Sequence, residues 1–507
     1  MNVKIKALTA GVLFFIGGAT VMAQKKSSDT TKVKVIEDVV LTGYTSKKTS
    51  EIIQSQSTIT SKEMANQPAT TTLSNMLQGK APGVMVQTSS GQPGSTGTIT
   101  IRGFSNFSNT PPLVVIDGMY SSIAQYNALN PNDVESQTIL KDAAGTAPYG
   151  ARGASGVILV TTKRGLSGKT NFSFETRIGT SFQTPDKELN FSMMDATQKV
   201  AWENEIATYN VGNTPYTPSE AAQLISQNHD WKKDVLRNSA EESYLFSARG
   251  GDKKNLFYYS LGYDSNTGII KYLKGLRRYT GRFNFESSLS DKIRVGLLSS
   301  VQYQVTQNQR DRYNAQNPIY FMYAANPYET VFLPDGSYNP TAAGFPILEA
   351  LSTNTGENKN LRLNGGVFGE YKFTNYLKFR STFNTTYAHL VTENITQRGS
   401  YLDVILGVNG QLGKANNDLF YFMTNQRLDF NKSFGKHRID AAAFYEYNSE
   451  NSNQMAATVR GLRTVGLNPA IISNYTTPFT STGAKQITTR TSIAGLLDYS
   501  YDKKYSF

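Results

Sequence analysis

The 507-residue sequence contains no cysteine, and this absence excludes several kinds of chemistry. Disulfide bonds, metal sites built on thiolates and cysteine nucleophiles all require that residue. Histidine is nearly as rare, and His229, His389 and His437 are too scattered along the chain to share a metal-ligand spacing. We therefore expect no metal site and no cysteine-based catalysis.

Long hydrophobic runs are also scarce. The apolar stretch Ala7 to Ala19 follows Lys4 and Lys6 and is followed by Val21-Met22-Ala23. It is too short for a transmembrane helix, but its charge, length and small final residue are typical of a secretory signal peptide over residues 1–23. No run of about 18 apolar residues occurs later, which excludes a helical membrane protein. The sequence predicts a protein that leaves the cytoplasm.

Recognisable catalytic patterns are missing as well. The glycine-rich segment at 91–98 lacks the Gly-Lys-Ser/Thr ending of a phosphate-binding loop. Asp117 precedes Gly118 as a turn residue does, and Asp142 follows an expected helix end, so the two do not suggest a paired acid and base. No G-x-S-x-G elbow is present. We expect no enzyme, no catalytic residues and no cofactor.

Basic and aromatic residues are plentiful. The formal net charge of +12 is spread thinly, which favours a solvated surface or one facing anionic lipid headgroups over nucleic-acid binding. Tyrosine (29) and phenylalanine (26) far outnumber tryptophan (2). An excess of tyrosine suits surfaces that are apolar at one end and wet at the other.

Residues 73–165 have the pattern of a small, glycine-rich α/β domain. Alternation around Val84 to Val86 and Ile99 to Ile101 predicts half-buried strands, and the apolar runs 113–116 and 157–160 predict strands covered on both faces. We also expect two short helices. They are Thr72 to Gln78, and Pro131 to Lys141 with its N-terminal proline, early acidic residues and final lysine.

From Thr170 onward, segments of roughly ten residues alternate apolar and polar positions, as the strands of outer-membrane barrels do. Tight turns at 290–292, 374–375, 435–436 and 502–504 alternate with long polar stretches near 184–241, 307–359, 391–417 and 449–486. A soluble β-sandwich is the alternative, but its loops do not sort so regularly. Roughly eleven strands are predicted. Because closed bacterial barrels use an even number, we expect a truncated chain, the first half of a longer barrel.

The motifs of the first domain carry a close resemblance to a known family. LQGKAPGVMVQTSSGQPGSTGTITIRG, then LVVIDGM, then ILKDAAGTAPYGARGASGVILVTTKRG, resembles the plug domain of SusC/RagA-type TonB-dependent outer-membrane transporters. The plug motif residues implied by this resemblance are Pro82, Gly83, Gly91, Pro93, Gly94, Arg102, Gly103, Asp117, Gly118, Lys141, Asp142, Tyr149, Gly150, Arg152, Gly153, Gly156, Thr161, Thr162 and Lys163.

The resemblance also implies a TonB box, a short segment that pairs as an added strand with the inner-membrane protein TonB. It falls on Asp38, Val39, Val40, Leu41, Thr42 and Gly43, within the isolated β-prone run 37–43. An ordinary edge strand is the alternative. The domain organisation predicted is a signal peptide at 1–23, a flexible leader at 24–48, a plug domain at 49–166 and an incomplete membrane β-barrel at 167–507.

The function implied is TonB-dependent, energy-coupled import of an oligosaccharide or oligopeptide across the outer membrane of a Gram-negative bacterium. The implied partners are TonB with its proton-motive-force-driven complex, a SusD-like surface lipoprotein, outer-membrane lipids and the glycan or peptide substrate, with no nucleic acid. A surface binding or adhesion protein, or a barrel fragment that does not transport, is the alternative. Arg102 and Arg152 lie beside glycines in apolar surroundings, so we expect carboxylate or carbonyl partners for them if they are buried.

Overall fold

The structure is a computed structural model that describes residues 39–42, 45–48, 55–64, 72–88, 90–103, 110–182, 193–209, 214–307, 316–502 and 505–506. The predicted signal peptide lies outside these residues. So do Asp38 and Gly43, the first and last residues of the predicted TonB box.

The plug domain is built on a five-stranded sheet in the order β3-β8-β9-β6-β7. Strand β6 runs parallel to β9, and every other pair is antiparallel. Strands β6 and β9 are largely apolar because the domain covers both of their faces, as the unbroken runs predict. The strands are β3 (Gln56–Thr60), β6 (Leu113–Ile116), β7 (Met119–Ser121), β8 (Val134–Leu140) and β9 (Val157–Thr162).

Two hairpins and several short helices complete the plug domain. The hairpins are β1 (Val39–Thr42) with β2 (Thr45–Lys48), and β4 (Val84–Gln87) with β5 (Thr98–Ile101). The helices are α2 (Ser61–Met64), α3 (Leu73–Met76), α4 (Ile123–Ala128), η2 (Pro131–Asp133), α5 (Ala143–Thr146) and η3 (Ala147–Gly153). The helix predicted over Thr72 to Gln78 is confirmed in a shorter form as α3.

The helix predicted over Pro131 to Lys141 is wrong. Pro131 to Asp133 form a single 3-10 turn that the Asn130 side chain caps, and the chain then enters strand β8. The proline and the acidic residue suit the start of either kind of helix. The pairing of β8 between β3 and β9 then decides the outcome, because it fills both edges of the strand.

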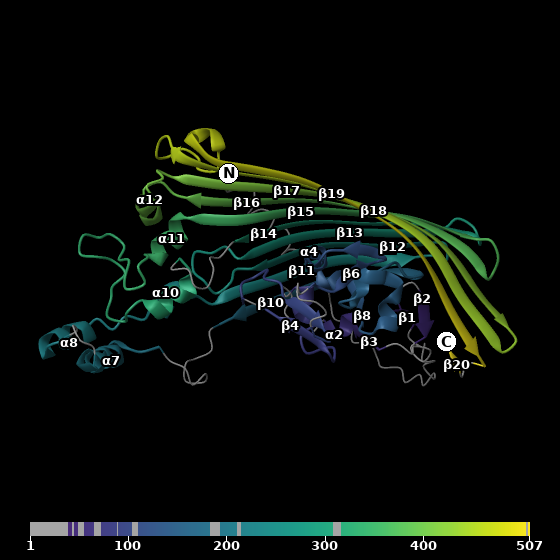
Figure 1. The fold of residues 1–507 in the computed structure, drawn as a ribbon, viewed down its shortest axis with the longest axis horizontal. Coiled ribbons are helices and arrows are strands. Elements are labelled where there is room, and N and C mark those ends of the chain that lie inside the picture. The colour runs from purple at the N-terminus through teal and green to yellow at the C-terminus, as the bar shows by residue number, and fades with distance from the viewer. Residues whose placement is uncertain are drawn as a thin grey trace, which may run out of the picture.

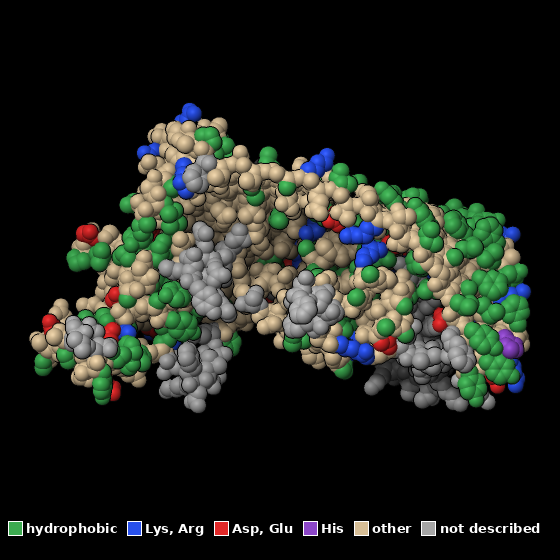
Figure 2. Space-filling model, viewed as in Figure 1, with side chains coloured by type: hydrophobic (Ala, Val, Ile, Leu, Met, Phe, Trp, Pro, Cys, Tyr) green, Lys and Arg blue, Asp and Glu red, His purple; other side chains and the backbone are tan. Residues whose placement is uncertain are grey.

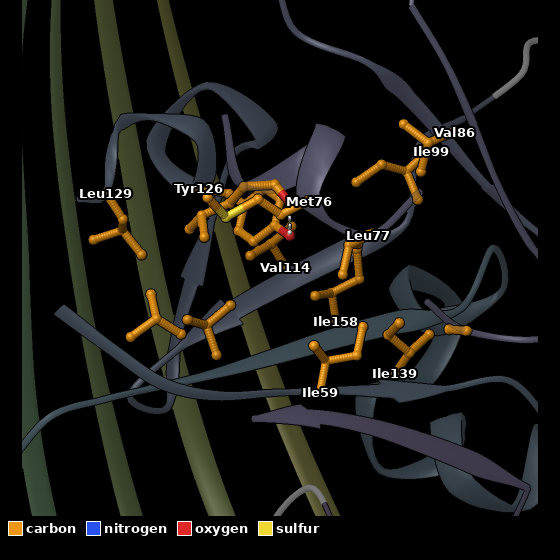
Figure 3. Packing of buried hydrophobic residues seen from close by; sticks show 14 of the residues in the cluster. Ile59, Met76, Leu77, Val86, Ile99, Val114, Tyr126, Leu129, Ile139 and Ile158 are labelled. Atoms are coloured by element: carbon orange, nitrogen blue, oxygen red, sulfur yellow. Dashed lines mark hydrogen bonds between the residues drawn. The ribbon is translucent and has the colours of Figure 1, made fainter. Parts of the chain in front are cut away.

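One continuous apolar core holds the plug domain together. Leu73, Met76 and Leu77 of the α3 region pack against Ile158 of β9 and Ile59 of β3. Figure 3 shows these side chains converging between the helices and the sheet.

The second part of the chain is an eleven-stranded antiparallel sheet in which every strand pairs with its neighbour in sequence. The sheet arches over the plug domain, and its edges β10 and β20 are not joined to each other (Figure 1). The strand count and the alternation match the sequence prediction. The strands are β10 (Gly168–Ser181), β11 (Ser239–Gly251), β12 (Asn255–Asn266), β13 (Leu276–Ser288), β14 (Ile293–Gln307), β15 (Thr355–Lys372), β16 (Leu377–Thr396), β17 (Gln411–Phe434), β18 (His437–Leu462), β19 (Tyr475–Tyr501) and β20 (Tyr505–Ser506).

Several of these strands are much longer than the ten residues predicted. Strands β17, β18 and β19 have 24, 26 and 27 residues, so they occupy much of the stretches near 391–417 and 449–486 that were predicted as loops. A strand of 26 residues spans roughly 85 Å at about 3.3 Å per residue, far more than an apolar band of about 25 Å. The added lengths are mostly polar, apart from a small buried cluster of Leu412, Val459, Leu462 and Tyr475, and alternation of hydrophobicity therefore does not reveal them.

Register sorts the side chains of the large sheet onto two faces. The row Tyr244, Tyr263, Tyr279 and Tyr303 lies on the outer face, where neighbouring rings are 5.0 to 6.5 Å apart. Tyrosines in such a row suit the boundary between lipid and water. The opposite, concave face turns toward the plug domain.

The long connections gather beyond one end of the large sheet, as Figure 1 shows at the left. Trp231, Phe321, Phe345, Ile347 and Leu402 form a shared apolar core that joins three of these connections. Among the described residues no helix is both long and apolar enough to cross a membrane. The helices here are α7 (Ala196–Tyr209), α8 (Pro218–Ile225), α9 (Trp231–Val235), α10 (Pro318–Ala324), α11 (Ile347–Thr353), α12 (Tyr401–Leu406) and η4 (Ile472–Asn474).

Candidate functional site

The candidate site is the contact between the plug domain and the concave face of the large sheet. At the start of the large sheet the fit leaves no space, because a Cβ on Gly165 would lie 2.3 Å from the backbone nitrogen of Phe257. Elsewhere the two parts meet through polar side chains and through an apolar cluster, in which Tyr421 and Met423 of β17 pack with buried plug residues such as Val115. Figure 2 shows the hollow under the arch of the sheet, with Lys and Arg side chains along its border.

Asp133 is one centre of this contact. Its Oδ1 accepts hydrogen bonds of 2.7 Å from the Tyr258 hydroxyl and from Ser260 Oγ, both on β12. Arg282 Nε of β13 lies 3.7 Å from the other carboxylate oxygen. All four side chains are buried. A buried carboxylate needs such partners to keep its charge, so this contact fastens the plug domain to β12 and β13.

Asp117 is a second centre. Asp117 and Gly118 form the two-residue turn between β6 and β7, with φ of 51° and 87°, a backbone that Asp-Gly tolerates well. The Asp117 carboxylate accepts hydrogen bonds from the amide and hydroxyl of Thr162 and lies 3.5 Å from Arg164 Nη2. Arg164 Nη1 also reaches Glu286 Oε1 of β13 at 3.1 Å.

The charge of Arg164 is fixed by these partners. Burial opposes it, but the nearby carboxylates of Asp117 and Glu286 raise the pKa of the guanidinium above its usual value. Arg164 therefore links the end of the plug domain to the sheet at any physiological pH. The adjacent backbone contributes as well, since the carbonyl of Lys163 accepts a 2.8 Å hydrogen bond from Asn284.

Arg152 connects the plug domain to strand β18, near the C-terminal edge of the large sheet. Its Nη2 lies 2.8 Å from Glu446 Oε1 of β18, and its guanidinium lies 3.7 Å above the ring of Tyr120. Tyr149 packs edge-on against Tyr120, and burial, together with the Tyr120 neighbour, raises its pKa. The carboxylate partner that the sequence predicts for Arg152 is present.

A charged cavity of about 680 Å³ separates the plug domain from the middle of the sheet. On the plug side it is lined by the Asp117-Gly118 turn, Tyr149 and Thr161. On the sheet side its lining is mostly charged, with side chains from β14 to β18: Arg294, Glu370, Lys378, Arg380, Arg427, Asp429, Arg438 and Asp440. The plug side of the lining also includes Val115, Leu159 and Val160, so a partly apolar plug surface faces the charged side chains of the sheet. Ion pairs such as Arg427–Asp429 and Arg438–Asp440 lie within the sheet.

A second cavity, of about 480 Å³, lies beneath helices α10 and α11 at the loop end of the sheet. Among the residues that the structure describes, its lining includes no charged side chain. It combines apolar residues such as Ile347 and Leu351 with amides and hydroxyls, which include Gln316, Asn354, Asn394, Thr396, Gln411 and Thr458. Cavities of this size with a few polar groups are typical of ligand sites.

Other predicted motif residues occupy two further places. Pro82, Gly83, Arg102, Lys141 and Asp142 gather around Ser55, the first described residue of the plug sheet. Arg102 is exposed there and binds Ser55 Oγ, so the expectation of a buried Arg102 with a carboxylate or carbonyl partner does not apply.

The predicted loop residues Gly91, Pro93 and Gly94 lie at the end of the plug domain nearest the loops. Gly94 has φ of 85°, and a Cβ there would lie 2.9 Å from the Thr306 side chain of β14. The neighbouring Gln92 side chain donates to the carbonyl of Gln307. The remaining motif glycines mark turns with positive φ or tight packing: Gly103, Gly150, Gly153 and Gly156.

Val39 to Thr42 of the predicted TonB box form β1, which pairs only with β2 among the described strands. The segment is therefore outside the plug sheet and is held as one arm of a hairpin. Its availability to a partner remains a prediction.

Sequence reasoning missed the residues on the sheet that receive the plug domain. Tyr258, Ser260, Arg282, Glu286 and Glu446 carry no local motif. Each occupies an inward position of its strand, but neighbouring inward positions such as Arg278 and Asn284 are polar too, so no local pattern marks these residues.

Comparison with known proteins follows the same division of the chain. Residues 48–157 match the TonB-dependent Receptor Plug Domain family. The chain is 29% identical to TonB-dependent receptor P26 of Formosa agariphila over 82% of its own length and 42% of that protein. It is 28% identical to TonB-dependent receptor SusC of Bacteroides thetaiotaomicron over 80% of its own length and 42% of that protein. The chain thus spans under half the length of these relatives.

The fold is similar to that of solved structures. The RagAB peptide importer in its open-open state superposes with a TM-score of 0.80 at 22% identity, over 92% of this chain and 55% of the other. The ferric citrate transporter FecA superposes with a TM-score of 0.53 at 11% identity, over 89% of this chain and 54% of the other. Both comparisons support a plug domain followed by part of a barrel.

Proposed function

This chain corresponds to the N-terminal portion of SusC/RagA-type TonB-dependent receptors, and from that premise we propose that the protein imports a nutrient across the outer membrane with energy supplied through TonB. The observation that carries the proposal is the attachment of the plug domain. It sits against the concave face of a membrane-type sheet through buried polar contacts and one shared apolar cluster, and a β1–β2 hairpin precedes its first strand.

The two cavities suggest a route for the substrate. The uncharged cavity beneath α10 and α11 is the proposed binding place, covered in the assembled importer by a SusD-like surface lipoprotein. The charged cavity beside the plug domain is the proposed exit, because the plug domain and the sheet are not packed against each other there. The proposed substrate is an oligosaccharide or an oligopeptide. The similarity in fold to a peptide importer supports including the second.

The proposed sequence of events begins with substrate in the outer cavity. Its binding releases the segment 37–43 from the hairpin, and TonB pairs with that segment as an added strand. The proton-motive force then pulls the plug domain partly out of place. Residues that anchor the plug domain, such as Asp133 and Arg164, limit how far it moves.

Deleting Asp38 to Thr42 tests the proposal. Uptake of labelled oligosaccharide or peptide fractions is expected to stop, while binding of the same fractions at the cell surface remains. Continued uptake in the deletion strain would overturn the mechanism. A protein that binds but never imports, even with its TonB box intact, would instead be the surface binding or adhesion protein. A closed barrel changes its gel mobility when it is heated, whereas an unassembled fragment does not. Gel mobility with and without heating therefore distinguishes the two.

A further inference from the structure

Ser55 is the point at which the plug sheet begins, and all of its polar groups are held. We propose that Ser55, Arg102, Lys141 and Asp142, together the Ser55 clamp, set the pulling force at which the plug domain starts to open. This inference rests on the proposed function, because the pull is the one that TonB exerts on the segment 37–43.

The clamp uses every hydrogen-bonding group of Ser55. Its amide donates to Asp142 Oδ2 at 2.6 Å, and its carbonyl accepts from the Lys141 amide at 3.2 Å. Its hydroxyl oxygen accepts from Arg102 Nη2 at 2.9 Å. Two of the three bonds involve a charged group, which strengthens a hydrogen bond, but both are exposed to solvent, which reduces that gain.

The three residues that hold Ser55 are themselves fixed to other parts of the plug domain. Asp142 caps α5 by accepting a 2.8 Å hydrogen bond from the Gly145 amide. Lys141 Nζ donates to Ser57 Oγ at 2.5 Å and to the Pro82 carbonyl at 2.8 Å. The charge of Arg102, after burial, lowers the pKa of Lys141, so the two cations are close neighbours.

Among the described residues that follow the β1–β2 hairpin, the clamp comes first in chain order. A pull on the segment 37–43 that straightens the hairpin therefore reaches the clamp before the other described contacts of the plug sheet. Strand β3, which follows, lies at the edge of the sheet and, among the described strands, pairs only with β8. Once the clamp opens, five paired residues and the core packing of Ile59 hold β3 in place.

Loss of β3 then opens the core. Ile59 of β3 and Met64 of α2 are 2% and 3% exposed, and both belong to the main apolar core of the plug domain. Figure 3 shows Ile59 beside Leu77, Ile139 and Ile158. Removal of β3 would leave these partners without cover, which lowers the free energy needed to open the next segment. Release of a small clamp is thereby amplified into opening of the domain.

Single-molecule pulling on the N-terminal end of the protein in a lipid membrane tests the clamp directly. Ser55→Ala and Asp142→Asn are expected to lower the force of the first opening event, and asparagine keeps the cap of α5. Ser121→Ala is the matched control, since Ser121 lies on the opposite edge strand β7 and bonds only to Met119. Its force is expected to equal that of the unaltered protein. Equal forces in all three variants would overturn the proposal.

Hydrogen exchange, measured without an applied force, is a second test on the same variants. Loss of one charge-assisted hydrogen bond in Asp142→Asn is expected to speed exchange of the amides of residues 56–60 about tenfold, while the amides of β7 stay unchanged. A variant that exchanges faster throughout the plug domain reports general unfolding instead, and would count against a local clamp.

A crosslink between β3 and β8 tests whether these two strands must separate for uptake. Thr58 and Thr138 are directly opposite, with hydroxyl oxygens 3.1 Å apart, so Thr58→Cys with Thr138→Cys is expected to form a disulfide in this cysteine-free chain. The crosslink is expected to stop uptake reversibly, with recovery on reduction. The control pair Met85→Cys with Thr100→Cys crosslinks the β4–β5 hairpin and is expected to leave uptake intact.

The failures of the two proposals are distinguishable. Uptake that persists without Asp38 to Thr42 overturns TonB-driven import. If that deletion stops uptake but the Thr58–Thr138 disulfide does not, only the clamp is overturned. The pulling experiment depends on neither TonB nor the substrate.

Discussion

Arg152 and Glu446 meet across 294 residues of sequence, with Arg152 Nη2 2.8 Å from Glu446 Oε1. The side chain of Glu446 is 0% exposed, and that of Arg152 is 26% exposed. Asn425 and Asn448 donate weaker bonds of 3.4 and 3.3 Å to the same carboxylate. The guanidinium is thus the cation that compensates a fully buried negative charge on the sheet.

Arg152→Ala is therefore expected to destabilise the contact between the plug domain and β18 by about 3 kcal/mol, because it leaves Glu446 buried and uncompensated. Exchange of the η3 amides is expected to quicken about a hundredfold. Adding Glu446→Gln is expected to restore most of the loss. Lys233→Ala removes an exposed pair with Asp230 and is expected to change stability by less than about 0.5 kcal/mol. A double variant as unstable as Arg152→Ala would contradict this account.

The strands were the part of the fold that local sequence predicts best. The alternation of apolar residues placed β12 to β16 within a few residues of their observed positions at one or both ends. It failed for the loop-side ends of β17 to β19, which are mostly polar and carry only a few apolar residues such as Leu412 and Val459. It failed again at β8, where the proline and acidic residues after Asn130 are typical of a helix start but Val134, Thr138 and Ile139 lie in a strand.

The sequence predicts the plug-domain residues of the candidate site but not the sheet residues that they contact. The plug motif supplied Arg152, Asp117 and Thr162 from a resemblance, whereas Glu446 and Arg282 have no nearby pattern that marks them. Which residue of a distant strand faces Arg152 depends on strand length, tilt and register together. These follow from pairing along the whole sheet rather than from any local segment.

Gly156 and Gly91 offer a second prediction, because both belong to the motif but differ in surroundings. Gly156 has φ of 89°, and a Cβ there would lie 2.7 Å from Ile101 Cδ1. Gly156→Ala is expected to cost about 2–4 kcal/mol through backbone strain and overpacking. Gly91 has an ordinary φ and open space around it, so Gly91→Ala is expected to be nearly neutral. Protease resistance of the plug domain is the measurement, and equal sensitivity of the two variants would refute the packing described.

The outer face of the large sheet gives the third prediction. Val367 of β15 points outward between Leu297 and Phe383, and all three are exposed in the isolated chain. If this band faces lipid, Val367→Arg is expected to lower the free energy of unfolding in a membrane by about 2–4 kcal/mol.

Asn453 is the control for that band. It also points outward, on β18, between Asp418 and Lys485, in the register row that continues the tyrosine row through Leu361 and His389. Asn453→Arg is expected to change the stability by less than about 1 kcal/mol, because this row lies at the boundary between lipid and water. Urea unfolding from lipid vesicles measures both variants. Equal effects of the two arginines would show that the band at Val367 does not face lipid, and the membrane-spanning part of the sheet would then have to lie elsewhere.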